Sequence, residues 1–225
     1  MSKRVRRESS QRTWIVLGAI AAVIVAAIVI AVASGGGDDT PKSAAHETGA
    51  VEVDGAALPS FRSGADPAVG KPIPTLTGIS FDGSPVTIAP NGKPQAIVFL
   101  SHSCPHCQAE VPRIVALERA GRLAGVDVTA VTTNTSPELP NYPPSAWLRR
   151  EHWLFPTMVD SKQFTAADAY GLPAFPYFVF VDAQGKVAGR TTGEIPSDGL
   201  AAIFKALAAG QPLTTASNGQ STPAN

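Results

Sequence analysis

Residues 95–112 read QAIVFLSHSCPHCQAEVP, an apolar run that leads into two closely spaced cysteines. Gln95–Leu100 has the composition of a buried central strand, and a helix-like pattern of apolar residues follows over Cys104–Arg119. Cys104 and Cys107 therefore lie where a strand ends and a helix begins. The chain holds no further cysteine, which excludes a disulfide-rich scaffold and a zinc site made of four thiolates.

A C-x-x-C motif at a helix N-terminus indicates redox chemistry. The unpaired N–H groups and the positive end of the helix dipole favour the thiolate of Cys104. Cys107 lies one turn further along, so we expect it to be more buried and to act as the resolving thiol. The alternative is a structural disulfide. So short a loop stabilises by about 2 kcal/mol, against about 4.7 for a 100-residue loop, which favours the redox interpretation.

The residues around this motif predict alternating strands and helices. The segments 79–81 and 86–88, rich in residues that favour strands, flank Asp82-Gly83 and predict a hairpin. Further strands are predicted at 126–132, 156–160, 177–181 and 186–192, and further helices at 145–153, 164–170 and 196–209. This order predicts an α/β domain over residues 69–210, with a mixed sheet that is covered by helices on both faces.

The N-terminal region predicts a membrane segment. Residues 14–33 carry no charge and consist mostly of Ala, Val and Ile; as a helix they would be about 30 Å long, close to the thickness of a bilayer core. A cleaved signal peptide is the alternative, because Ala31-Val32-Ala33 matches the A-x-A cleavage pattern. In both cases the basic tail 1–13 stays in the cytoplasm and the rest of the chain is exported.

The segments on either side of the domain show no sustained periodicity. We expect residues 34–68 to be a flexible linker and residues 211–225 to be a disordered tail. Residues 1–13 hold five Lys or Arg and one Glu, so the rest of this formally neutral chain has a net charge of −4. With no basic stripe in the body, nucleic acid is not an expected partner.

Residues 96–112, which contain the C-x-x-C motif, and the later segment YGLPAFPYFVFVD, residues 170–182, together resemble the sequences of thioredoxin-fold proteins. Over residues 66–210 the chain is most similar to the membrane-tethered TlpA/ResA-like thiol-disulfide oxidoreductases. The resemblance implies a three-layer α/β sandwich with a mixed central sheet, behind one transmembrane helix. It also implies disulfide exchange with exported proteins outside the cytoplasmic membrane, with a membrane electron donor or acceptor as a further candidate partner. No organic cofactor or metal is implied.

The resemblance also assigns roles to individual residues. Pro176 matches the cis-proline that faces the C-x-x-C and helps to bind extended substrate backbone; Phe175 before it makes this surface more apolar. Glu110 matches an acidic residue that assists proton transfer, with an ordinary exposed helix glutamate as the alternative. His106 gives a Cys-Pro-His-Cys sequence like that of DsbA, an oxidant, and we expect its imidazole beside Cys104.

Two questions stay open at this point. The architecture resembles reductases of cytochrome c maturation whereas Cys-Pro-His-Cys resembles an oxidant, so electrons could flow either way. The alternative function is a copper chaperone like the Sco proteins, with His102 and His106 joining the two cysteines as ligands. That family uses a C-x-x-x-C spacing, one residue longer than here. Peroxidase action has less support, because Ser101 stands where peroxiredoxins have Thr.

Overall fold

The computed structural model describes residues 45–62, 64–215 and 221–223. The predicted basic tail and membrane span, residues 1–33, lie outside the described residues. Within the described part of the chain, no helix has both the length and the apolar character that crossing a bilayer requires.

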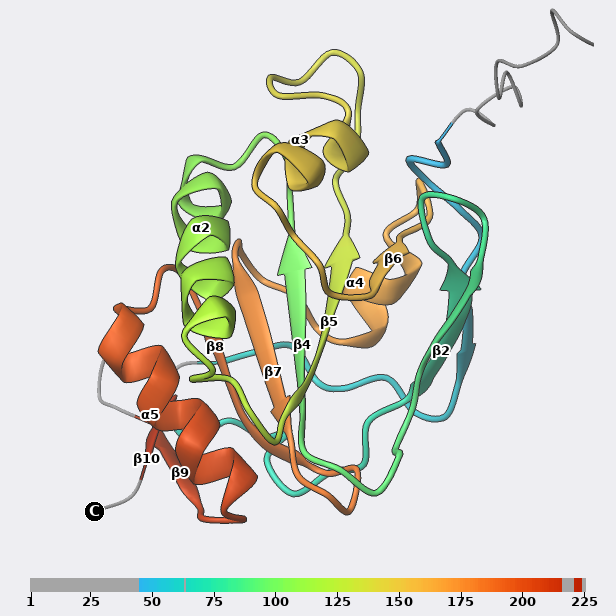
Figure 1. The fold of residues 1–225 in the computed structure, drawn as a ribbon. Helices are drawn as coiled ribbons and strands as arrows, with labels where there is room; N and C mark the ends of the chain where they lie inside the picture. Colours follow the sequence, from blue (N-terminus) through green and yellow to red (C-terminus); the bar gives the residue numbers. More distant parts are fainter. Residues whose placement is uncertain (1–44, 63, 216–220, 224–225) are drawn as a thin grey trace, which may run out of the picture. The chain divides into compact units, whose positions relative to one another are not determined.

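A five-stranded sheet forms the centre of the domain, with the strand order β6-β5-β4-β7-β8 (Figure 1). Strand β4 pairs in parallel with β5 and antiparallel with β7, so the sheet is mixed, as predicted. The bounds are β4 Gln95–Leu100, β5 Asp127–Thr132, β6 Thr157–Val159, β7 Tyr177–Val181 and β8 Val187–Thr192.

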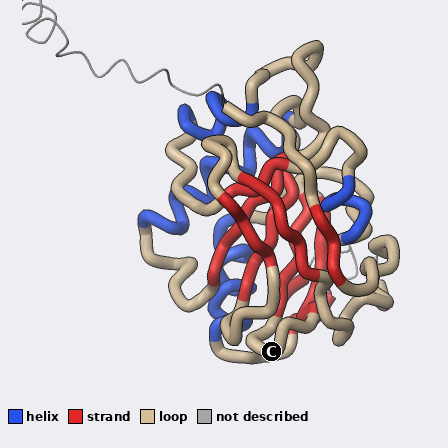
Figure 2. The backbone as a smooth tube through the Cα atoms, turned by 90° about the vertical axis from the view of Figure 1, so that its right-hand side faces the viewer, coloured by secondary structure: helices blue, strands red, loops and turns tan. Residues whose placement is uncertain are grey.

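Side chains of β4 alternate between two apolar cores, as expected for a central strand that is buried on both faces. Ala96, Val98 and Leu100 join the core beneath helices α2 and α5, whereas Ile97 and Phe99 join the core on the α4 side. The helices are α2 Pro105–Arg119, α3 Pro144–Arg150, α4 Thr165–Ala169 and α5 Ser197–Ala208. The strands lie between helices on both sides (Figure 2), which gives the three layers of the expected sandwich.

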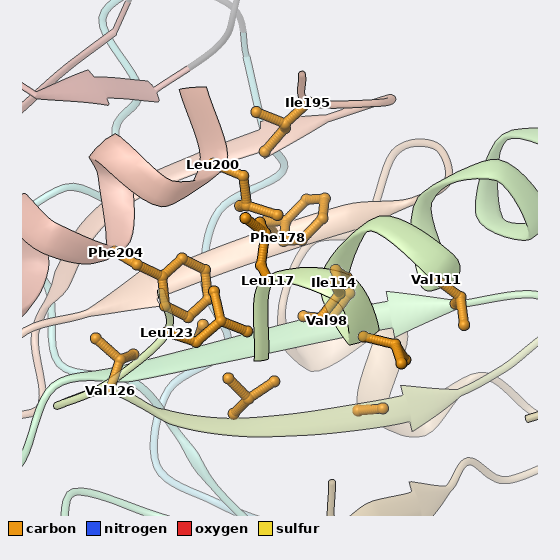
Figure 3. Packing of buried hydrophobic residues seen from close by; sticks show 14 of the residues in the cluster. Val98, Val111, Ile114, Leu117, Leu123, Val126, Phe178, Ile195, Leu200 and Phe204 are labelled. Carbon is orange, nitrogen blue, oxygen red and sulfur yellow. The ribbon is translucent and has the colours of Figure 1, made fainter. Parts of the chain in front are cut away.

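The core under α2 is the one that supports the C-x-x-C motif. Val98 of β4 and Phe178 of β7 meet Ile114 of α2 and Leu200 and Phe204 of α5 in this core (Figure 3). Because α2 is packed along the sheet in this way, its N-terminus is held at the end of β4. The packing therefore fixes where the two cysteines lie.

The predicted hairpin is present, and it belongs to a second, smaller sheet. Strand β2, Thr75–Ile79, pairs antiparallel with β3, Pro85–Ile88, and also with β1, Glu52–Asp54. The turn contains Asp82 and Gly83, and Gly83 has φ +82°, a conformation that favours glycine. The structure thus confirms the hairpin and adds a strand that the sequence analysis did not predict.

The predicted flexible linker, residues 34–68, is wrong for its described part. The backbone N–H of His46 donates to Phe81 at 2.7 Å, and that of Gly49 donates to Asp160 at 3.1 Å. Glu47 accepts a hydrogen bond from the backbone N–H of Ser145 at 3.0 Å, in the first turn of α3. The segment is held by polar contacts with distant residues and by the short pairing of β1 with β2, and neither leaves a periodic pattern in the sequence.

Part of the predicted disordered tail, residues 211–225, is also ordered. Strand β9, Leu213–Thr215, pairs antiparallel with β10, Ser221–Pro223. The prediction of disorder is therefore wrong for these two strands. Their short length, well below that of a typical strand, explains why no alternating pattern was visible.

Candidate active site

The C-x-x-C motif spans the start of α2. Cys104 is the N-cap residue, with extended backbone angles, and Pro105 occupies the first helical position. Proline suits this position because its missing N–H would have no helical partner and its fixed φ matches the helix. Both cysteines are free thiols; Cys104 is partly exposed and Cys107 is fully buried. The expected difference in burial is thus present.

Cys107 lies in an environment that keeps its thiol protonated. Burial raises the pKa of Cys107 well above that of an ordinary thiol, and the neighbouring Cys104 and Glu110 raise it further. The backbone N–H of Ser101 donates to the Cys107 sulfur at 3.5 Å, which opposes this shift without cancelling it. At neutral pH Cys107 therefore needs a nearby base to become a thiolate.

The segment before β7 faces Cys104. The Cys104 thiol donates to the carbonyl oxygen of Phe175 over an S···O distance of 3.9 Å. The Phe175–Pro176 peptide bond is cis, which confirms the isomer expected of Pro176. Phe175 is partly buried and packs against both apolar cores. The structure thus brings Pro176 and the C-x-x-C motif together, although they are far apart in sequence.

Glu110 is fully buried, so the alternative of an ordinary exposed helix glutamate is wrong. Its Oε2 accepts hydrogen bonds from Arg113 Nη1 at 3.0 Å and from the backbone N–H of Ile195 at 3.2 Å. Its Oε1 is buried and has no hydrogen-bond partner among the described residues. Burial raises the pKa of Glu110 even though Arg113 and Ile195 oppose the shift.

His106 forms its ring hydrogen bond with a carboxylate and not with the Cys104 sulfur that was expected. Its ring Nδ1 donates instead to Glu194 Oε1 at 2.7 Å, and its side chain is 68% exposed. Arg113 Nη1 binds the other oxygen of Glu194 at 2.6 Å. Glu194 lies in the turn between β8 and α5, 88 residues from His106. No local sequence pattern relates the two, which is why the analysis of the motif alone missed this carboxylate.

His102 anchors the loop between β5 and α3. Its Nδ1 bonds to the Pro140 carbonyl oxygen at 2.8 Å, and its Nε2 accepts from the Ser136 backbone N–H at 3.4 Å, so Nδ1 carries the proton. The side chains of Gln108 and Asn141 donate to the His102 carbonyl oxygen. Because both ring nitrogens are used, His102 is not free to complete the copper site considered above. No cluster of three His, Cys, Asp or Glu suited to a metal occurs among the described residues.

Comparison with known proteins places this fold and motif in a family. A family model described as Redoxin matches residues 68–207, more than half of the chain. The chain belongs to the Redoxin family. This membership confirms the thioredoxin-like α/β fold. It also supports, at a general level, the prediction that the protein is a thiol-disulfide oxidoreductase.

Two curated relatives match this Redoxin family chain. Thiol:disulfide interchange protein TxlA from Synechococcus elongatus is 28% identical, over 62% of this chain and 60% of its own length. Methylamine utilization protein MauD from Methylobacillus flagellatus is 27% identical, over 55% of this chain and 57% of its own length. The chain thus spans about three fifths of the length of these relatives.

Solved structures show the same fold. A thiol:disulfide interchange protein from Chlorobium tepidum has a TM-score of 0.52 and 24% identity, covering 61% of this chain and 95% of its own. StoA from Bacillus subtilis has a TM-score of 0.50 and 17% identity, covering 62% of this chain and 99% of its own. At these identities the likeness shows the fold alone.

Proposed function

We propose that this Redoxin family chain is a thiol-disulfide oxidoreductase, tethered to the cytoplasmic membrane, that exchanges disulfides with exported proteins on the outer side. The observation that carries the proposal is the asymmetric thiol pair at the start of α2. Cys104 is partly exposed, whereas Cys107 is buried on α2, three residues before the buried Glu110, with which it interacts electrostatically. One sulfur is therefore accessible to a substrate, and the other is protected until the first has reacted.

The residues support a two-step exchange. In the first step the Cys104 thiolate attacks a substrate disulfide, a mixed disulfide forms, and one substrate sulfur leaves as a thiolate. In the second step Cys107 gives its proton to Glu110, and its thiolate attacks the Cys104 sulfur. The Cys104–Cys107 disulfide forms and the second substrate sulfur leaves. The substrate gains two electrons, the protein loses two, and the reverse sequence oxidises a substrate dithiol.

Glu110 is the proton acceptor in this scheme because of its surroundings. The unpartnered Oε1 leaves one buried oxygen available for a proton. The raised pKa of Glu110 makes its carboxylate a stronger base than an exposed glutamate. Glu110 and Cys107 lie three residues apart on α2, and this spacing places them on the same face of the helix.

The exported location is supported by the sequence and by the chemistry. The uncharged residues 14–33, after a basic tail, favour an anchor with the N-terminus in the cytoplasm. Protein disulfides persist in oxidising compartments outside the cytoplasm, where substrates of this kind are found.

Trapping of substrates tests the proposed function. In the full chain, Cys107→Ser removes the resolving thiol, so exported proteins should accumulate as mixed disulfides on Cys104. Non-reducing electrophoresis of membrane fractions would reveal them, and reduction should release them. Cys104→Ser is the matched control and should trap none. Equal trapping by the two variants would show that Cys104 is not the nucleophile.

A further inference from the structure

The turn between β8 and α5 connects the exposed and buried parts of the site. The Glu194 carboxylate binds His106 through Oε1 at 2.7 Å and Arg113 through Oε2 at 2.6 Å. The next residue, Ile195, donates its backbone N–H to the buried Glu110 at 3.2 Å. One short turn therefore contacts α2 at three places around the thiol pair.

Arg113 is shared between two carboxylates. Its Nη1 lies 3.0 Å from Glu110 Oε2 and 2.6 Å from Glu194 Oε2. The side chains form a series from His106, which is mostly exposed, through the partly buried Glu194 and Arg113, to the fully buried Glu110. A change of charge at the exposed end therefore acts on the buried carboxylate through direct contacts.

We infer that Glu194 is a positioning residue for the dithiol reaction: it holds Arg113 and His106 together and thereby sets the pH range in which Glu110 accepts the proton of Cys107. This inference rests on the proposed function. It assigns a role to Glu194, Arg113 and His106, and it places the control of the reaction in a turn that lies far along the chain from the C-x-x-C motif.

The electrostatics of the cluster give the sign of the effect. Hydrogen bonds from His106 and Arg113 lower the pKa of Glu194, so this carboxylate is ionised at neutral pH. Its negative charge adds to burial in raising the pKa of Glu110, whereas Arg113 lowers it. Loss of the Glu194 charge leaves Arg113 to act on Glu110 alone. The pKa of Glu110 should then fall.

The ionisable groups that face Glu110 come from two elements. Among the described residues, Cys107 and Arg113 belong to α2, and Glu194 belongs to the β8–α5 turn. His106, also on α2, acts on Glu110 through its contact with Glu194.

The rate of the resolving step tests this inference in the full chain. When the reduced protein reacts with 5,5′-dithiobis(2-nitrobenzoate), the second, concentration-independent release of thionitrobenzoate reports the attack of Cys107 on the Cys104 mixed disulfide. With Glu194→Gln, the apparent pKa of this phase should fall by about half a unit. The shift is modest because the side chains of Glu194 and Arg113 are both partly exposed. With Arg113→Gln it should rise. A general loss of structure would not produce opposite shifts.

Asp198→Asn is the matched control. Asp198 lies four residues after Glu194, its side chain is 93% exposed, and its partner is Arg122 at 3.0 Å, outside the cluster. Its removal changes the net charge equally and should leave the pH profile unchanged. In a Glu110→Gln background, Glu194→Gln should add no further shift, because the group through which it acts is gone.

Three results would overturn the inference. These are an unchanged profile in Glu194→Gln, an equal shift in Asp198→Asn, and a shift that persists in the Glu110→Gln background. If the unmodified chain shows no second release at any pH, the proposed function fails instead. The two failures are therefore distinguishable in one set of measurements.

Discussion

The Arg190 guanidinium binds the Asp66 carboxylate through two hydrogen bonds, one of them Nε to Oδ2 at 2.7 Å, and both side chains are completely buried. Arg190 Nη1 also donates to the carbonyl oxygens of Pro59 and Tyr170. Strand β8 thus fixes a segment that precedes β2. Pro59 and Asp66, both predicted as linker, are therefore part of the domain.

Removing one partner of this pair should destabilise the fold. With Asp66→Ala, the free energy of unfolding should fall by about 3–5 kcal/mol, because the Arg190 charge stays buried without its carboxylate. Urea denaturation of the full chain measures the change. Asp198→Asn, which breaks an exposed pair with Arg122, should cost less than about 1 kcal/mol. Similar losses in the two variants would contradict the structural role of Asp66.

The buried Glu110 should make stability depend on pH. Burial raises the pKa of Glu110 above its ordinary value of 4.5, so the folded protein binds this proton more tightly than the unfolded chain does. The stability that this group contributes is fully present below pH 4.5 and is lost as the pH rises through the raised pKa of Glu110. The side chain in Glu110→Gln stays neutral at every pH. The free energy of unfolding of this variant, relative to that of the unmodified chain, should therefore increase as the pH rises through this range.

Denaturant titrations over a series of pH values measure this gain. Glu138→Gln is the control: Glu138 is exposed, and its hydrogen bond from Ser136 lowers its pKa rather than raising it. It should show no such gain with rising pH. Parallel pH curves for Glu110→Gln and the unmodified chain would show that the carboxylate is not perturbed.

The two thiols should differ in reactivity. Cys104 is partly exposed, whereas Cys107 is fully buried and its pKa is raised. Iodoacetamide at neutral pH should therefore modify Cys104 faster, by about tenfold or more, because the thiolate is the reacting form. Mass spectrometry of timed samples measures both rates. In Cys104→Ser, Cys107 should remain slow; rapid modification there would contradict its protected position.

Membrane attachment is a separate prediction from residues 14–33. The full chain should fractionate with membranes and resist extraction by salt and carbonate, because about 20 apolar residues span a bilayer. A chain that lacks residues 1–33 should be released. Recovery of a soluble mature form that begins at Ser34 would instead identify the segment as a cleaved signal peptide.

The sequence predicted those features that have a local pattern. The apolar run at β4, the periodicity of α2 and the turn residues of the β2–β3 hairpin each gave an element close to its observed bounds. The partners of His106 and Asp66 could not be predicted, since the two pairs join residues that are 88 and 124 positions apart through side-chain contacts alone. The buried Glu110 likewise accepts a hydrogen bond from the backbone N–H of Ile195, which is 85 residues away.

The central claim, that Cys104 and Cys107 form a reversible redox couple, is tested most directly by equilibrating the full chain with a series of glutathione buffers and measuring the oxidised fraction. We expect a single two-electron transition, absent in Cys107→Ser. The resemblance of Cys-Pro-His-Cys to the DsbA motif predicts a potential above the roughly −270 mV of thioredoxin. A lower value would favour the reducing direction, and a pair that stays oxidised below about −300 mV, as structural disulfides do, would contradict the claim.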